Sequence, residues 1–222
     1  MKVMRLGQAG LLLDTGNTKA LIDPYFTDSA YEVSGIRRRI PVPPFVWDIK
    51  PDAVLFTHDH IDHYDPETAR HYVNESTCVT VISPRSVWEK VIHNGGDNNY
   101  VLASPGVRWT CGDMSVSTVR AAHSDPFAVG YVFDAEGKRI YVTGDTLFSL
   151  DISLPFESVD QIFLPINGRG NNMNAPDAAL FARHVNAKTA TPVHYGMLDD
   201  IDPRVFEFEN TFIMNDFTEY NI

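Results

Sequence analysis

Four side chains that bind metal ions well stand within six positions of one segment, Thr57-His-Asp-His-Ile-Asp-His63. Three more follow far downstream. Together, the seven candidate ligands are His58, His60, Asp62, His63, His123, Asp145 and His194. Neutral imidazole and carboxylate hold zinc, manganese or iron, and seven such donors suit two ions rather than one. The sequence therefore predicts a site for two divalent ions, zinc or manganese with iron also compatible, and the chemistry of a metal-dependent hydrolase.

A solvated loop that carries these residues by chance is the alternative explanation for the cluster. Single histidines such as His71, His93 and His184 need no function, because most histidines in proteins serve packing or solvation. Three imidazoles and a carboxylate within six residues would pack poorly in an apolar core. The three further ligand candidates downstream argue further against a loop that carries these residues by chance.

The elements around the cluster place it where α/β proteins carry their sites. Residues 52–57 form a short and mainly apolar run, which predicts a buried strand. After the cluster, Asp65 and Pro66 form an N-cap and a first helical turn that open a helix over residues 68–73. The candidate ligands then occupy a loop at the carboxyl end of a strand, which is the usual position of such sites.

The three downstream ligands each follow another predicted strand. His123 follows the alternating residues 114–119, Asp145 follows residues 139–143, and His194 follows residues 189–193. Gly144 allows the backbone to turn sharply toward a ligand. Pro192 predicts that the last of these strands is short or lies at a sheet edge. Four strand ends are thus expected to deliver all the ligands to one rim.

The order His-x-His-x-Asp-His, a single His, Gly-Asp and a final Pro-x-His resembles the pattern of the metallo-β-lactamase superfamily, over nearly the whole chain. Within it, residues 57–63 and Leu164-Pro-Ile-Asn-Gly-Arg169 are similar to the L-ascorbate-6-phosphate lactonase branch. The chain is shorter than those lactonases, so insertions that shape their substrate pocket are expected to be missing.

This resemblance implies an α/β (α+β) fold, a four-layer αββα sandwich formed here by a single domain over residues 1–222. The sequence is compatible with that fold. Residues 10–15 and 18–22 flank Gly16-Asn17 as a tight hairpin, and residues 129–133 and 139–142 flank a second one. Helices are expected from Ser83-Pro84 to Gly95-Gly96 and over residues 174–185.

The resemblance also implies the role of each ligand. It assigns His58, His60 and His123 to one ion, Asp62, His63 and His194 to the other, and Asp145 to a bridge between them. A bound divalent metal lowers the pKa of water toward about 7, which suits attack on an ester, lactone or phosphoester, including a sugar-phosphate lactone. Asp62 is the second catalytic candidate, because it can orient the nucleophile or pass a proton to the leaving group.

Other residues are candidates for supporting roles. Asn167 and Arg169 lie in a glycine-rich segment and are predicted to bind substrate, as is Tyr195, although an aromatic wall is an equal alternative for Tyr195. The tripeptide 37–39, Arg-Arg-Arg, suits either an anion-gripping loop or a solvated loop. Asp23 and Asp59 are candidates to support a ligand imidazole, and capping of a turn is the alternative for Asp59.

Composition limits the partners. The net charge of −11 lacks the basic excess of a nucleic-acid-binding protein, so we expect no nucleic acid and instead a small, anionic substrate. No apolar run approaches the roughly 20 residues that span a bilayer, so we expect a cytoplasmic protein without membrane contact. The lactonase likeness adds the expectation of a homo-oligomer. Cys78 and Cys111 are expected to be buried free thiols.

Three other functions stay open at this point. A phosphodiesterase for cyclic or nucleotide-like small molecules would use the same metal chemistry. Iron redox chemistry, as in thiol oxygenases, also occurs on this fold, but His60 argues against the diiron type, which by resemblance has Glu at that position. A metal-stabilised binding module without catalysis is the third alternative.

Overall fold

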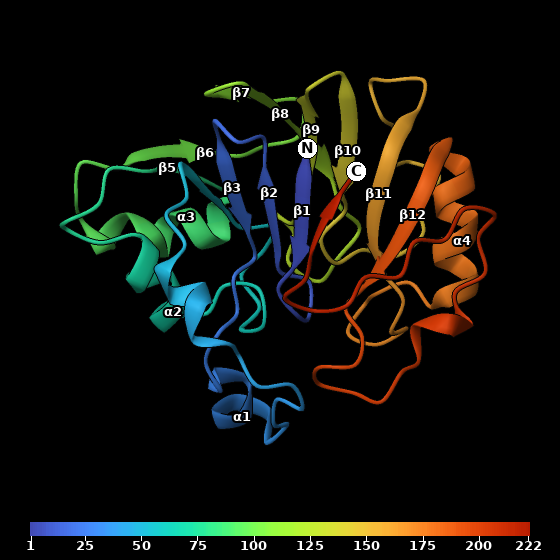
Figure 1. Cartoon of the computed structure of the whole chain (residues 1–222), viewed down its shortest axis with the longest axis horizontal. Helices are drawn as coiled ribbons and strands as arrows, with labels where there is room; N and C mark the ends of the chain where they lie inside the picture. The colour runs from blue at the N-terminus through green and yellow to red at the C-terminus, as the bar shows by residue number, and fades with distance from the viewer.

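The computed structural model describes residues 1–222 and contains two β-sheets that face each other (Figure 1). The seven-stranded sheet has the order β13-β1-β2-β3-β4-β5-β6. Its strands are β1 (Lys2–Arg5), β2 (Leu11–Asp14), β3 (Lys19–Ile22), β4 (Ala53–Leu55), β5 (Thr80–Ser83), β6 (Asn99–Leu102) and β13 (Glu219–Asn221). It is antiparallel from β13 to β3 and parallel from β3 to β6.

The six-stranded sheet has the order β12-β11-β10-β9-β8-β7. Its strands are β7 (Arg108–Cys111), β8 (Met114–Arg120), β9 (Val129–Ala135), β10 (Lys138–Val142), β11 (Val159–Pro165) and β12 (Ala187–Val193). Strands β10, β11 and β12 are parallel, and the other pairs are antiparallel. The carboxyl ends of β10 and β12 therefore lie at the same edge.

Helices cover the outer face of each sheet (Figure 1). The helices of the chain are α1 (Ser29–Ser34), α2 (Pro66–Tyr72), α3 (Arg85–Val91) and α4 (Ala175–His184), with 3-10 turns η1 (Pro44–Asp48), η2 (Ile92–Asn94) and η3 (Pro203–Val205), and α1 lies below the sheets in Figure 1. Helices α2 and α3 pack on the seven-stranded sheet, and α4 packs on the six-stranded sheet. A central apolar cluster with members from both sheets lies between them. The expected αββα sandwich is confirmed.

Local sequence signals explain where these helices begin and end. Asp65 caps α2 through a hydrogen bond from the backbone N–H of Glu67, and Asn174 caps α4 in the same way through Asp177. Gly95 ends the α3–η2 segment with a φ of 75°. The expected helices over 84–95 and 174–185 are confirmed, and α2 begins two positions before the predicted residue 68 because Pro66 occupies its first turn.

The strands agree with the sequence pattern in position but differ in detail. Both hairpins form, with β2 paired to β3 and β9 paired to β10. Strand β12 lies at the edge of its sheet, as Pro192 predicted, although it is seven residues long. The expectation of buried thiols is wrong for Cys78, which is exposed before β5 begins, and Cys111 is only partly buried.

Helix α1 is one of the elements that the sequence analysis did not predict. It is six residues long and projects from the lower end of the molecule in Figure 1, beneath the sheet edges. Gly35 ends it in a left-handed conformation. None of the helices has the length and apolar character needed to cross a membrane.

Candidate metal centre

The structure brings all seven predicted ligands together at one edge of the sandwich. They form two groups whose donor atoms lie within 4.8 Å of one another. The first group contains His58, His60, His123 and Asp145, and the second contains Asp62, His63 and His194. The strands explain this convergence, because the ligands follow the ends of β4, β8, β10 and β12.

The first group is a cage of three imidazoles. The ring centroids of His58, His60 and His123 are 4.5–4.7 Å apart. His123 Nε2 lies 3.2 Å from His60 Nδ1, and His58 Nε2 lies 3.9 Å from Asp145 Oδ2. Donor atoms at these separations can share one cation. The group therefore offers three nitrogen donors and one carboxylate oxygen.

The second group is more deeply buried. His194 Nε2 lies 3.2 Å from Asp62 Oδ2, and His63 Nε2 lies 4.0 Å from the same oxygen. The rings of His63 and His194 are stacked with their centroids 5.4 Å apart. Both imidazoles thus face the Asp62 carboxylate from one side, which suits a cation between the three side chains.

Asp145 belongs to the first group and also lies close to the histidines of the second. Its Oδ2 lies 3.9 Å from His58 Nε2 and 3.2 Å from His194 Nε2, while its Oδ1 lies 3.2 Å from His63 Nε2. The Asn172 amide donates a hydrogen bond of 2.8 Å to Oδ2 and so fixes the carboxylate plane. This position is the one that a bridging carboxylate needs.

Asp23 supports the ligands from beneath, as the sequence suggested. Its Oδ2 lies 2.8 Å from His63 Nδ1 and accepts a 2.6 Å hydrogen bond from the Thr57 hydroxyl, and its Oδ1 accepts the Thr57 N–H. This arrangement leaves His63 Nε2 directed toward the site. Asp59 instead pairs with Lys90 Nζ at 2.8 Å, so its charge is engaged away from the ligand imidazoles.

Unusual backbone conformations allow the ligand loops to approach one another. Gly144 has a φ of 61°, and a Cβ there would lie 2.7 Å from Cβ of Thr57. Only glycine fits this contact between the β10 and β4 ends. His194 itself has a φ of 58°, a costly conformation that its N–H stabilises by donating to the Gln8 carbonyl at 2.8 Å.

The surroundings lower the pKa of His58 and raise the pKa values of His63 and His194. Burial lowers the pKa of His58, with a further lowering from the neighbouring His63. Burial also opposes protonation of His194, but the carboxylates of Asp145 and Asp62 outweigh it and raise the pKa of His194 to about 10. The pKa of His63 is raised for the same reason, by Asp145, Asp23 and Asp62.

Unpartnered buried atoms test whether these residues fit metal ions. His58 Nε2, His63 Nε2 and Asp145 Oδ1 are buried without a well-aligned hydrogen-bond partner, although His63 Nε2 and Asp145 Oδ1 lie 3.2 Å apart. Buried polar atoms are normally paired, because an unpaired one costs about 1–3 kcal/mol. All three atoms are among those that converge on the two groups, and coordination of a cation would satisfy them. The donor set therefore fits metal ions.

Gln8 belongs to the site although the sequence analysis did not identify it. Its side-chain amide donates a 2.7 Å hydrogen bond to Asp62 Oδ2 and lies 3.2 Å from the ring nitrogens of His194. It stands in the β1–β2 turn, far from the histidine segment. The neighbouring glycines, Gly7 and Gly10, were the only local signal of an unusual turn. The sequence analysis also missed Asn172, because it too lies far in sequence from the ligand that it contacts.

A cavity of about 660 Å³ opens over the two groups of candidate metal ligands, which we call the metal groups. Asn167 and Arg169, both predicted to bind substrate, line it. Tyr195 does not: its ring is buried beneath Arg5, whose Cζ lies 3.9 Å from the ring centroid, and its hydroxyl donates to the Met214 carbonyl. The substrate role expected for Tyr195 is therefore corrected to a packing role.

The arginine tripeptide 37–39 also lies outside the cavity lining. Arg38 donates to the carbonyls of Tyr25 and Thr27 at 2.7 and 2.9 Å, so it holds the loop in place. Arg37 stacks on the ring of Tyr31 at 4.0 Å. This geometry fits the solvated-loop alternative.

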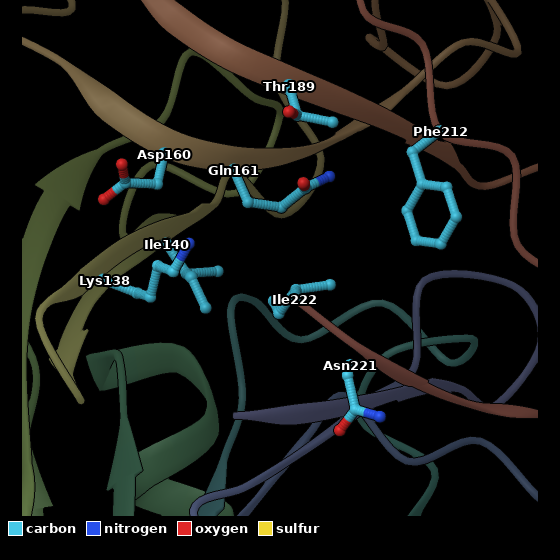
Figure 2. Close-up of a pocket in the computed structure, with 8 residues that line it drawn as sticks. All are labelled: Lys138, Ile140, Asp160, Gln161, Thr189, Phe212, Asn221 and Ile222. Carbon is cyan, nitrogen blue, oxygen red and sulfur yellow. The ribbon is translucent and has the colours of Figure 1, made fainter.

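A second cavity, of about 260 Å³, lies at the opposite ends of the strands. Figure 2 shows Ile140, Phe212 and Ile222 around the amide of Gln161. That amide is already paired with Thr191 Oγ1 at 2.6 Å. The cavity has no histidine and no cluster of metal-binding groups, so the metal centre remains the only strong candidate for catalysis.

Comparison with known proteins identifies the family. A family model described as "Beta-lactamase superfamily domain" matches residues 18–195, which include every candidate ligand. The chain belongs to the metallo-β-lactamase superfamily. A UPF0173 metal-dependent hydrolase of Bacillus thuringiensis is 28% identical to this superfamily member over 220 residues, covering 94% of the chain and 91% of the relative.

Solved structures of other proteins share the fold. Igni18, a metallo hydrolase from the archaeon Ignicoccus hospitalis, has a TM-score of 0.77 at 19% identity and covers 100% of this chain and 98% of its own. An isothiocyanate hydrolase from Delia radicum gut bacteria has a TM-score of 0.77 at 19% identity, with 100% and 99% covered. At these identities, the similarity establishes the fold.

Proposed function

We propose that this protein is a hydrolase that holds two divalent metal ions and acts on a small ester, lactone or phosphoester. The observation that carries the proposal is the convergence of seven imidazole and carboxylate side chains, three of whose donor atoms are buried without a well-aligned hydrogen-bond partner. Its membership of the superfamily and the hydrolases among its relatives support the same conclusion.

The two groups would hold the two ions. His58, His60 and His123 would bind one, Asp62, His63 and His194 would bind the other, and Asp145 would bridge them. Zinc or manganese suits this set of donors, and iron is also compatible. When bound, divalent metal supplies a nucleophile near neutral pH by lowering the pKa of water toward about 7.

The protein's own groups orient the reactants and move protons. Asp62 lines the cavity as a member of the second group, where its carboxylate can orient the nucleophile and pass a proton to the leaving group. In the metal-free protein, His63 and His194 outweigh burial and lower the pKa of Asp62 well below its usual value, so the carboxylate is charged at neutral pH. A carboxylate of such low pKa is a weak base, so it suits the transient relay of a proton and not its retention.

Arg169 is the residue best placed to select an anionic substrate. It is the only arginine or lysine among the residues that line the cavity, and its guanidinium makes no ion pair within the chain. A free arginine fork matches a phosphate or carboxylate bidentately. Asn167 lies beside it with a buried and unpartnered Oδ1, which can accept a hydrogen bond from a substrate hydroxyl. A sugar-phosphate lactone carries both groups.

Substitution of Asp145 tests the two-metal site. Asp145→Asn is expected to lower the metal content from two ions per chain toward one or none and to remove most hydrolysis, because a neutral amide bridges cations poorly. Elemental analysis and assays with a panel of esters, lactones and phosphodiesters would measure both effects. Full metal content with wild-type hydrolysis in this variant would rule out the bridge. In the wild-type protein, faster turnover of phosphodiesters than of esters and lactones would favour the phosphodiesterase alternative.

Substitution of Arg169 tests the anion contact separately. Arg169→Ala is expected to raise KM for anionic substrates by about tenfold to a hundredfold, since a charge-assisted contact contributes about 1.5–3 kcal/mol. Metal content should stay at the wild-type level. Arg70→Ala, which removes an exposed arginine outside the cavity, is the matched control. An unchanged KM in Arg169→Ala would remove this residue from the substrate site.

A further inference from the structure

One side of the cavity over the metal groups is apolar. Five side chains form this side, which we call the apolar wall: Ala30, Val33, Ile36, Ile61 and Leu198. The polar residues Asn167, Arg169 and Asn172 line the same cavity. Val33 and Ile36 come from α1 and the residues just after it, the part of the fold that projects below the sheet edges in Figure 1.

Three of the wall residues pack against buried side chains behind them. Ala30 is buried in a small cluster with Tyr25 and Met197, and Ile61 and Leu198 pack against that cluster. A hydrogen bond of 2.8 Å from Arg39 N–H to the Met197 carbonyl ties the segment after α1 to the loop that follows β12. The wall is therefore held by contacts to the two loops that carry His60, Asp62 and His194.

The charged side chains of α1 and of the segment after it do not line the cavity, whereas Asp59 and Asp199 do. Glu32 lines a neighbouring pocket that shares Val33 and Ile61 with the cavity. Arg37 and Arg38 are engaged by the Tyr31 ring and by backbone carbonyls, as described above. The side of α1 that faces the metal groups thus presents Ala30, Val33 and Ser34 without a charge.

Val33 and Ile36 stand at the rim with much of their surface in water. Val33 is 73% exposed and Ile36 is 48% exposed. Because His60 and Asp62 line the same cavity, a molecule whose reacting group lies at the metal donors can extend a substituent across the wall. The cavity volume of about 660 Å³ falls within the roughly 300–1,000 Å³ of small-molecule pockets.

We infer that the substrate carries an apolar substituent, an alkyl, acyl or aryl group, which lies on the apolar wall while its hydrolysable bond lies at the metal groups. The inference rests on the proposed function and deepens it by naming the substrate class. It favours an amphiphilic ester or lactone over a sugar-phosphate lactone, because a fully polar substituent would leave Val33 and Ile36 in water and gain nothing from them.

Binding of n-alkanoates of increasing length, from acetate to decanoate, tests this inference by calorimetry on the metal-loaded protein. Burial of each methylene group against the wall is expected to tighten binding by about twofold to fourfold. The double variant Val33→Asp/Ile36→Asp should flatten this dependence on chain length. Leu180→Asp is the matched control, because Leu180 is 51% exposed on α4 and lies outside the cavity.

Two results would overturn the inference. Affinity that does not depend on chain length in the wild type would show that the wall contacts no ligand, and this result does not depend on how any variant folds. Sedimentation that shows a wild-type dimer and a monomeric double variant, with the same chain-length dependence in both, would assign the wall to a second copy of the chain.

The outcome is separable from that of the proposed function. If the metal-loaded protein bound long alkanoates tightly but hydrolysed no ester, lactone or phosphodiester, the proposed function would fail and the apolar subsite would stand. If it hydrolysed short esters but its alkanoate affinity were flat, the inference would fail and the proposed function would stand.

Discussion

Gln8 is the residue that links the first hairpin to the metal centre. Its side-chain amide donates to Asp62, and its carbonyl accepts the N–H of His194, so one residue holds two ligands of the second group. The side chain is 2% exposed. Residues that orient metal ligands in this way typically change metal affinity by about 10–100-fold when they are removed.

Gln8→Gly is expected to weaken binding at the second group by that factor and to leave the first group occupied. Glycine is the appropriate substitution because Gln8 has a φ of 42°, so the change removes the side chain without adding backbone strain. After dialysis against a weak chelator, the metal content should fall from two ions toward one per chain. A variant that retains both ions would show that Gln8 does not position the second group.

At the level of elements, one tyrosine joins the two sheets beneath the ligand loop. Tyr131 of β9 is fully buried, and its hydroxyl donates a 2.6 Å hydrogen bond to the Phe56 carbonyl, directly after β4. The same hydroxyl lies 3.2 Å from the Ile82 carbonyl of β5. It therefore fixes the six-stranded sheet against the strand end that carries His58.

Tyr131→Phe is expected to lower the free energy of unfolding by about 1–3 kcal/mol, because it leaves the Phe56 carbonyl buried without its partner. Urea denaturation at matched metal content would measure the change. Tyr31→Phe is the control, since Tyr31 is exposed and its hydroxyl makes no hydrogen bond, and it should change stability by less than about 0.5 kcal/mol. Equal stability of the two variants would contradict the role assigned to Tyr131.

Strand ends and turns could be predicted because their signals are local. The apolar runs before His58, Asp145 and His194 predicted three strand ends, and these positions agree with β4, β10 and β12. Pro192 predicted the edge position of β12. Gln8 and Asn172 could not be predicted, because their roles depend on which loops meet in space. Tyr195 shows the converse: it adjoins a ligand in sequence, but its side chain points into the core.

We expect the whole molecule to gain stability when metal ions bind to the two ligand groups. Asp23, Asp62 and Asp145 lie close together in its interior, and bound cations would offset their mutual repulsion. Binding at a hundredfold excess over Kd contributes about 2.7 kcal/mol, and this corresponds to a shift in Tm of roughly 5–11 °C for a chain of this size. Chelation should lower Tm by that amount, and an unchanged Tm would argue against tight metal binding.

This metal-dependent stability is expected to grow as pH rises. In the metal-free protein, carboxylates outweigh burial and raise the pKa of His194 to about 10, so its imidazolium compensates the buried acids at neutral pH. A raised histidine pKa stabilises the fold fully below the unfolded value of about 6.5, and that contribution is lost as pH rises toward the folded value. Metal must also displace this proton, so metal affinity should rise over the same range. Melting curves with and without chelator from pH 6.5 to 9.5 would measure the difference in Tm, and a difference that shrinks with pH would contradict this coupling between protons and metal.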